Sequence, residues 1–455
     1  MRLSFNSTSS KLTFLNHASF VVETKNSILV SDPWLEGFAF NKGWSLLDQT
    51  TSNDALIEAL AETNKKIFFW YSHEHSDHFA IPLLKKIKIH DIQIDVLFQD
   101  TLDRRVTNYL ESNEIKVRIL QDGQVFQIDQ ELSFLIHSWR SGDSLSYINV
   151  GDVGVLNIND CIVAKESEAQ KIKKILDGHG YNVDFLFSQF GYANWEGNEN
   201  DTILRKHSAD EKLRRLSLQN TVFEPKIIVP FASFVYFSHP ENFYLNDEQN
   251  CPSRLRSSQW MKECSYKTVF LKPYDQFELT DCDASRDLLL ENSTEAEKHW
   301  NSLFHEIAPV PSNDTQFPLE SIVSYWKKFL GSVTHQFLGL FQVLEAFRLI
   351  QPLTIRVTDL DVFVHFSYLW GIRSTSESGD YDLSMTSEVL AFSLKHEFGF
   401  DTTLVNGRFR VSRMGKNRKA MKFLGVQNLL KNGFGYRRPI STFCELLRLS
   451  KREED

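Results

Sequence analysis

The segment from Ile67 to His78 joins an apolar run to a dense group of metal-ligating side chains. Its first five residues are apolar or aromatic and are typical of a buried strand. The pattern His-x-His-x-Asp-His follows directly and contains His73, His75, Asp77 and His78. Alternate side chains of an extended segment share one side, so we expect the first two histidines together and the last two ligands, after a bend, at a second nearby point. Three imidazoles and one carboxylate suit zinc, iron or manganese, and predict a metal site rather than a solvated histidine-rich loop.

The neighbouring sequence predicts the elements that hold this segment. Residues 11–16 and 18–32 predict strands, with a hairpin at 25–26, and His17 lies between them. This histidine could be a distant ligand, although a structural hydrogen bond is the commoner role. Residues 80–120 predict helix, strand, helix and strand in turn, and residues 124–158 predict four further strands, an order typical of α/β folds.

Two aromatic stretches are candidates for a substrate pocket. The region from Trp34 to Trp44 is dense in aromatic residues and glycine, and we interpret it as a loop that walls a pocket. Core packing explains the same pattern equally well. Residues 183–195 predict a strand followed by a Gly-Tyr-x-Asn-Trp loop, which would place Tyr192 and Asn194 at the pocket mouth.

The histidine-rich motif resembles the signature of the metallo-β-lactamase superfamily, whose fold is a four-layer αββα sandwich. A closer resemblance is to the metallo-β-lactamase-like part of the CMP-N-acetylneuraminate hydroxylase family. It rests on further blocks, which span about residues 12 to 245 with the motif: Asp32–Phe40 with Gly43-Trp44, Ile158–Cys161, and Pro230–Ala232 with Ser238–Pro240. The resemblance implies an α/β sandwich, which we expect to be followed by a smaller α+β C-terminal domain.

The resemblance also implies roles for residues outside the motif. Asp160 stands where the superfamily places its metal-bridging aspartate, and His239, before a proline, matches the last ligand position of the subgroup. Asp32 matches an acid that supports the metal loop through hydrogen bonds. The superfamily also has a histidine in a Gly-His-(Ser/Thr)-Pro-like turn, which this sequence lacks. His137 and Asp143 are the candidates to replace it. Alternatively, His137 is a packed strand residue and Asp143 is a turn residue.

The bulk properties limit the domain organisation and the classes of partner. The length of 455 residues predicts two domains, at 1–285 and 300–455, with a polar, turn-rich boundary at 276–316. A net charge of -9 argues against nucleic acid or an anionic membrane as the main partner. No apolar run reaches the length of a membrane span. Five cysteines, odd in number and without a C-x-x-C pair, favour a reducing compartment, so we expect a cytoplasmic protein.

The C-terminal third predicts an α+β domain without a ligand cluster. Its expected elements are helices at Glu320–Leu330, Thr334–Leu349 and Thr386–Phe398, and strands at Leu353–Val357, Val362–Ile372 and Arg408–Val411. The stretch from Arg408 to Lys422 is basic. It is compatible with a phosphate-binding surface or, more commonly, with a solvated helix face.

The predicted chemistry is that of two divalent cations, whether zinc, iron or manganese. Such a pair lowers the pKa of a water between them to give a hydroxide, and Asp77 could take the proton as well as bind metal. This favours a hydrolase acting on a small polar substrate, with a sugar or nucleotide-sugar as one option. The family resemblance implies the alternative of a di-iron monooxygenase that hydroxylates an N-acyl sugar nucleotide. That enzyme would need a separate electron-transfer partner, because no paired Cys-x-His and Cys-x-x-His motifs occur. A scaffold without catalysis is disfavoured, because unused buried histidines and aspartates are costly to keep.

Overall fold

The chain forms two compact units in this computed structural model, which describes residues 3–377, 379–413 and 416–451. The first unit comprises Met1–Ala193, Ile203–Tyr236 and Asn246–Ala308, and the second comprises Asn194–Thr202, Phe237–Leu245 and Pro309–Asp455. Two short segments of the second unit therefore come from within the sequence of the first. The division expected from sequence, at 1–285 and 300–455, contains no such exchange of segments.

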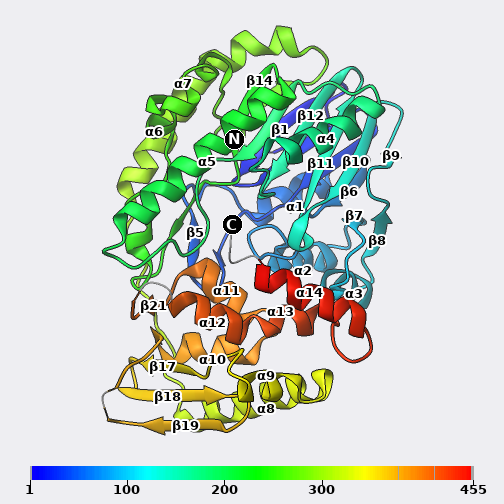
Figure 1. The fold of residues 1–455 in the computed structure, drawn as a ribbon. Helices are drawn as coiled ribbons and strands as arrows, with labels where there is room; N and C mark the ends of the chain where they lie inside the picture. Colours follow the sequence, from blue (N-terminus) through cyan, green and yellow to red (C-terminus); the bar gives the residue numbers. More distant parts are fainter. Residues whose placement is uncertain (1–2, 378, 414–415, 452–455) are drawn as a thin grey trace. The chain divides into compact units, whose positions relative to one another are not determined.

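The first unit is built on two mixed sheets (Figure 1). The seven-stranded sheet has the order β16 (Gln276–Glu278), β1 (Lys11–Asn16), β2 (Ser19–Glu23), β3 (Ser27–Ser31), β6 (Lys66–Trp70), β7 (Asp95–Gln99) and β8 (Lys116–Leu120). Strands β16 to β3 pair antiparallel, and β3, β6, β7 and β8 pair parallel. Strand β6 is buried after its first residue, which explains why its sequence is a continuous apolar run.

The second sheet of this unit has six strands. Their order is β14 (Ile227–Phe231), β13 (Phe185–Gln189), β12 (Val153–Asn159), β11 (Ser144–Val150), β10 (Leu132–Ser138) and β9 (Val125–Gln127). Here β12, β13 and β14 run parallel, and the remaining pairs are antiparallel. A small third sheet has the order β15 (Val235–Phe237), β5 (Trp44–Leu46) and β4 (Phe38–Ala39).

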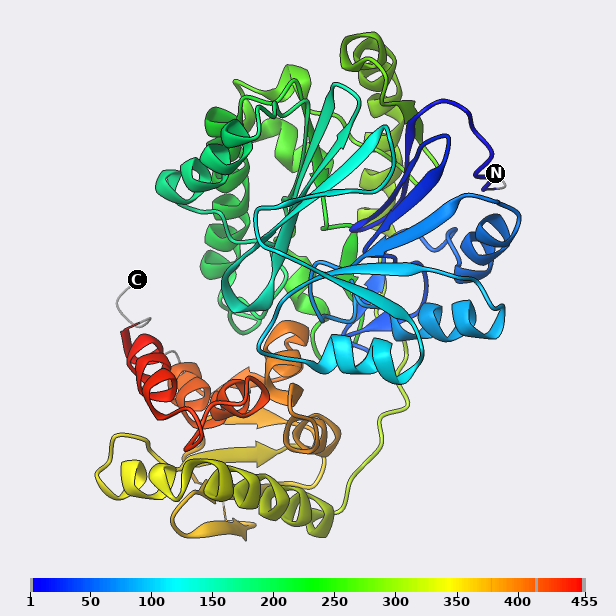
Figure 2. The same ribbon diagram turned by 90° about the vertical axis from the view of Figure 1, so that its right-hand side faces the viewer.

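Helices cover the outer faces of the two large sheets (Figure 2). Helices α4 (Glu166–Gly178) and α5 (Thr202–Phe223) lie on the six-stranded sheet, where Ile172 and Phe223 join its buried core. Helices α1 (Asn53–Ala61), α2 (Ile81–Ile89) and α3 (Arg105–Ser112) lie on the seven-stranded sheet. The expected αββα sandwich is therefore confirmed. No helix among the described residues is long and apolar enough to cross a membrane.

The end of the first unit contains a long helix where the sequence predicted turns. After the short α6 (Pro252–Ser257), helix α7 extends from Cys282 to Glu306, inside the stretch expected to be a turn-rich boundary. The prediction of turns is wrong there because the polar residues form the exposed side of an amphipathic helix. The buried side carries Trp300, whose ring stacks on Phe234 at 4.1 Å and whose indole N–H donates to the Leu271 carbonyl.

The second unit is an α+β arrangement, as expected. Its five-stranded sheet has the order β19 (Gly371–Thr375), β18 (Val362–Ser367), β17 (Leu353–Val357), β20 (Leu383–Met385) and β21 (Arg410–Val411). Its helices are α8 (Leu319–Phe337), α9 (Leu340–Ala346), α10 (Ser387–Lys395), α11 (Gly399–Asn406), α12 (Lys416–Leu424), α13 (Val426–Lys431) and α14 (Pro439–Lys451). The core of this unit forms around Trp326, which stacks on Phe423 and packs edge-on against Phe366.

Candidate metal centre

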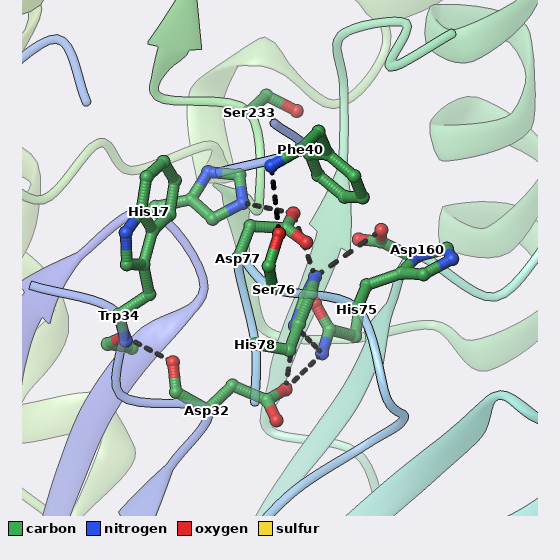
Figure 3. A network of polar contacts seen from close by, with 12 residues as sticks. His17, Asp32, Trp34, Phe40, His75, Ser76, Asp77, His78, Asp160 and Ser233 are labelled. Atoms are coloured by element: carbon green, nitrogen blue, oxygen red, sulfur yellow. Dashed lines mark hydrogen bonds and ion pairs between the residues drawn. The ribbon is translucent and has the colours of Figure 1, made fainter. Parts of the chain in front are cut away.

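The histidine-rich loop and Asp160 meet at the carboxyl ends of two central strands. The loop follows β6, and Asp160 follows β12, the strand at which the second sheet changes from antiparallel to parallel pairing. Strand ends at such a switch point are favoured positions for sites in α/β proteins. The structure brings the predicted ligands of the loop and Asp160 into one cluster (Figure 3): His73, His75, Asp77, His78 and Asp160.

His78 is the centre of this cluster. Its Nε2 atom lies 3.3 Å from Oδ2 of Asp77 and 3.4 Å from Oδ2 of Asp160. The ring of His73 lies 4.3 Å from that of His78, and Nε2 of His73 lies 2.8 Å from Nδ1 of His75. The side chains of His78 and Asp77 are almost completely buried, and Asp160 is about one-fifth exposed. The cluster is therefore a buried arrangement of nitrogen and oxygen donors with one edge open to solvent.

These donors form two groups of three that share His78. One consists of His17, Asp77 and His78, and the other of His73, His78 and Asp160, with the donor atoms of each group within 4.8 Å of one another. Nε2 of His78 and one carboxylate oxygen each of Asp77 and Asp160 are buried without a hydrogen-bond partner. Buried polar atoms without partners are costly, so this donor set fits two divalent metal ions.

A network of hydrogen bonds fixes the ring of His78 from behind. Its Nδ1 lies 3.1 Å from Oδ2 of Asp32, the acid expected to support the loop. Asp32 also accepts the backbone N–H of Ser72 at 2.7 Å and the side-chain amide of Asn159 at 2.5 Å. The Ser72 hydroxyl lies 2.9 Å from Nδ1 of His73. Such contacts set the orientation and tautomer of ligating imidazoles.

Sequence reasoning missed Ser72 and Asn159. Asn159 has a φ of 53°, in the left-handed region that asparagine tolerates better than most residues. A polar residue of this kind at the end of a buried strand, next to a candidate ligand, is the signal that could have identified it. Ser72 carries no such signal, because serine is common in loops.

Opposite charges hold Asp77 and His78 in their charged forms when no metal is bound. Burial alone would raise the pKa of Asp77, but the charge of His78 and a hydrogen bond with His17 outweigh it, and the pKa is well below its usual range. Burial would lower the pKa of His78, but Asp77, Asp160 and Asp32 raise it well above the ordinary value. The two residues thus form a buried ion pair.

His73 and Asp160 differ in their electrostatic environment. Burial, followed by the charges of His78 and His75, lowers the pKa of His73, so its ring is neutral and able to bind metal. Burial would raise the pKa of Asp160, but His78 reverses this, and the net pKa is lowered. The site therefore offers a neutral imidazole and ionised carboxylates.

The structure separates the two candidates for the additional ligand. His137 lies on β10, where its Nδ1 is 3.0 Å from the carboxylate of Asp122, and it is in neither donor group. Asp143 lies within the electrostatic field of the cluster. Burial raises its pKa to about 7, with His75 acting in the opposite direction and Asp160 reinforcing the rise. Of the two, Asp143 is the one beside the metal-binding loop.

His239 is placed in the second unit, in a cluster of charged side chains. Its Nε2 lies 3.1 Å from Oδ2 of Asp314, and its Nδ1 lies 3.4 Å from the carboxylate of Glu241. Both acids also contact Arg408, whose side chain is completely buried and which reaches Glu388 as well. The local partners of His239 are therefore two acids, Asp314 and Glu241, whose donor atoms lie with its own within 4.8 Å of one another and form a third group that could hold a metal ion. Its role as a metal ligand stays a prediction.

The aromatic residues proposed to line a pocket are mostly buried. Trp34 packs perpendicular to the ring of His17 at 5.7 Å, and Trp44 packs on Phe40 at 4.7 Å. Phe40 also contacts the His75 ring at 5.4 Å, so this loop lies directly against the metal-binding loop (Figure 3).

The two residues of the later aromatic loop fall in different units. Tyr192 is buried in the first unit, whereas Asn194 is exposed and belongs to the second. Their contact with substrate stays a prediction, like that of the two tryptophans.

The basic stretch from Arg408 to Lys422 is partly buried and partly exposed, with Arg413, Arg418 and Lys422 on the surface, so a solvated face or a phosphate-binding surface stays a prediction for its exposed part. Arg408 is buried, Arg410 stacks over Tyr244 at 4.2 Å, and Lys419 pairs with Asp382 at 2.6 Å. The side chains of Arg408, Arg410 and Lys419 therefore have partners within the second unit.

A cavity of about 1010 Å³ lies away from the metal-binding loop. Its lining includes Lys66, Asp95 and Lys116, which begin β6, β7 and β8, so it adjoins the amino ends of the strands. The loop follows the opposite, carboxyl end of β6, where ligand sites of parallel sheets form. This cavity is not part of the candidate centre.

Comparison with known proteins supports the resemblance seen in the sequence. The chain is 26% identical over 280 residues to the cytidine monophosphate-N-acetylneuraminic acid hydroxylase of Cricetulus griseus, covering 58% of this chain and 47% of that protein. It is 26% identical over 261 residues to the inactive human protein of the same name, covering 54% of this chain and 50% of the relative. The chain thus spans about half the length of these curated relatives. No protein-family model matches it.

Among solved structures, the chain resembles CmlA, a diiron β-hydroxylase from Streptomyces venezuelae. The TM-score is 0.42 and the identity 13%, with 60% of this chain and 55% of that chain covered. The curated relatives and the αββα sandwich together support the resemblance: this chain is similar to the CMP-N-acetylneuraminate hydroxylases and has the two-sheet architecture expected of a metallo-β-lactamase-like protein.

Proposed function

We propose that this protein is a metal-dependent hydrolase that activates water for attack on a small polar substrate. The observation that carries the proposal is the pair of buried donor groups that share His78, at the carboxyl ends of β6 and β12. Two divalent ions bound there would lower the pKa of a water molecule and polarise a carbonyl or phosphoryl oxygen. The proposed ligands are His73, His75, Asp77, His78 and Asp160.

The residues of the chain have distinct roles in this proposal. Asp77 would help to hold the metal, and its Oδ1, which has no hydrogen-bond partner in the protein, would be available to accept a proton from water. Asp32 and Ser72 hold the rings of His78 and His73 in place. A sugar or nucleotide-sugar is the proposed substrate class, because the names of the relatives specify such a compound.

The test is an assay without oxygen. Protein purified without added metal is loaded with zinc or manganese under anaerobic conditions and offered esters, lactones, amides and phosphoesters of sugars. Hydrolysis should persist without oxygen and be lost in His75→Ala. The matched control is His137→Ala, because that histidine is paired with Asp122 outside the donor groups.

A second candidate function is hydroxylation by a di-iron centre. The 26% identity to relatives named as hydroxylases, over more than half of this chain, favours it. Iron and dioxygen would then be required, with electrons from a separate partner protein. Activity that depends on iron, dioxygen and a reductant, with one atom of ¹⁸O₂ incorporated into the product, would establish this function and exclude the hydrolase.

A further inference from the structure

His17 lies in a tight turn whose backbone conformation and hydrogen bonds fix the position of its ring. The turn joins β1 to β2, and His17 has a φ of 38°, where tight turns usually contain glycine or asparagine. Left-handed backbone is uncommon for residues other than glycine, although histidine, asparagine and aspartate adopt it more readily than most. Both backbone groups of His17 are held, since its N–H donates to the Asn16 side chain at 2.9 Å and its carbonyl accepts from Ala232 at 3.0 Å.

The ring of His17 is buried and directed at the metal-binding loop. The residue is 1% exposed, and its ring packs perpendicular to Trp34. Nε2 of His17 lies 3.3 Å from Oδ2 of Asp77, and Figure 3 shows the contacts continuing from Asp77 to His78 and Asp160. Left-handed backbone at a residue whose side chain enters a site is a common feature of functional positions.

The distances within this group fit metal ligands better than hydrogen bonds. Charge-assisted N–H···O bonds are about 2.7–2.9 Å long. Two donors held about 2.0–2.1 Å from one tetrahedral ion lie about 3.3 Å apart. The separations here are 3.3 Å for His17 to Asp77, 3.3 Å for His78 to Asp77 and 3.4 Å for His78 to Asp160.

A second ion also needs donors beyond those of the loop. The two donor groups both use His78, and one imidazole cannot complete two separate coordination shells. Among the described residues, His17 is the histidine from outside the loop that joins these groups. His239 belongs to a separate donor group with Asp314 and Glu241 in the second unit, which shares no residue with the two groups at His78.

We infer that His17, on the turn between β1 and β2, is a metal ligand. Together with Asp77 it completes the second metal site, and it takes the place in that site that was predicted for His239. The inference deepens the proposed metal-dependent function and concerns the metal site alone. It therefore applies equally to a hydrolase and to a hydroxylase. The competing role for His17 is a hydrogen bond that only orients Asp77.

The experiment measures bound metal rather than activity. Wild-type protein, His17→Asn and His17→Gln are loaded with Co²⁺ or Zn²⁺, and the bound ions per chain and their affinities are measured by elemental analysis and chelator competition. Asparagine suits the left-handed backbone, so His17→Asn should fold, and glutamine retains a hydrogen-bond donor near Asp77. His137→Gln is the matched control.

If His17 is a ligand, the wild type and His137→Gln bind two ions per chain, and both His17 variants bind one fewer. The Co²⁺ absorption spectrum of the His17 variants should change as well. Loss of an orienting contact alone reduces metal affinity roughly 10–100-fold and leaves the stoichiometry intact. Two ions in His17→Gln, or a wild type that binds only one, would overturn the inference. A wild type that binds two ions but hydrolyses nothing would count against the hydrolase and not against His17.

Discussion

Asn159 donates a hydrogen bond from its side-chain amide to Oδ2 of Asp32 at 2.5 Å, although 127 positions separate the two residues. Asp32 directly follows β3 of the seven-stranded sheet, and Asn159 ends β12 in the other sheet. The contact therefore joins the two sheets of the sandwich directly behind His78. A movement of one sheet relative to the other would change the orientation of this ring.

The first prediction concerns this contact. Asp32→Asn should lower the affinity for metal roughly 10–100-fold, because an amide in this position cannot accept as strongly from His78, Ser72 and Asn159 together. The matched control is Asp122→Asn, which removes the carboxylate beside His137 outside the donor groups. Equal metal affinity in the two variants, measured by chelator competition, would show that Asp32 does not orient the ligands.

The metal-binding loop could be predicted from sequence because its four ligands lie within one short segment after an apolar strand. The contacts of His17, Asp32 and Asn159 depend on how two sheets pack, and no local pattern specifies them. The sequence around His17 is the same whether its ring binds a metal ion or only a carboxylate, so the sequence cannot distinguish these two roles. The resemblance supplied the αββα fold, which periodicity alone does not determine.

Helix boundaries show a second limit of sequence reasoning. The sequence predicted separate helices at Glu320–Leu330 and Thr334–Leu349, but α8 continues from Leu319 through Gly331 to Phe337. The chain leaves the helix at Leu338 and Gly339, which both have left-handed backbone. A glycine inside a helix costs only about 1 kcal/mol relative to alanine, and the packing of Trp326 and Val333 outweighs it.

The second prediction concerns the stability of the second unit. Arg408→Met should destabilise it by about 3–5 kcal/mol, because it leaves the carboxylates of Glu241, Asp314 and Glu388 without their buried cation. Arg413→Met is the control, since its pair with Asp380 is exposed and contributes only about 0–1 kcal/mol. Urea unfolding monitored by tryptophan fluorescence measures both. A loss no larger than that of the control would mean that this arginine is dispensable for the fold.

The third prediction concerns the pH dependence of the same cluster. Burial would raise the pKa of Asp314, but the Ser312 hydroxyl and the charge of Arg408 lower it to about 2. In the unfolded chain an aspartate has a pKa of about 3.9. Because the folded value is lower, ionised Asp314 stabilises the protein fully above about pH 4, and this contribution is lost as the pH falls towards about 2.

Asp314→Asn should therefore lower the melting temperature most at neutral pH, and its difference from the wild type should narrow as the pH falls below about 4. Thermal unfolding of both proteins from pH 7 to the acid limit of the folded state provides the measurement. Asp380→Asn is the control, because its exposed partner Arg413 contributes little at any pH. A difference between Asp314→Asn and the wild type that stays constant across this range would mean that the carboxylate stabilises the unit through its shape and hydrogen bonds and not through its charge.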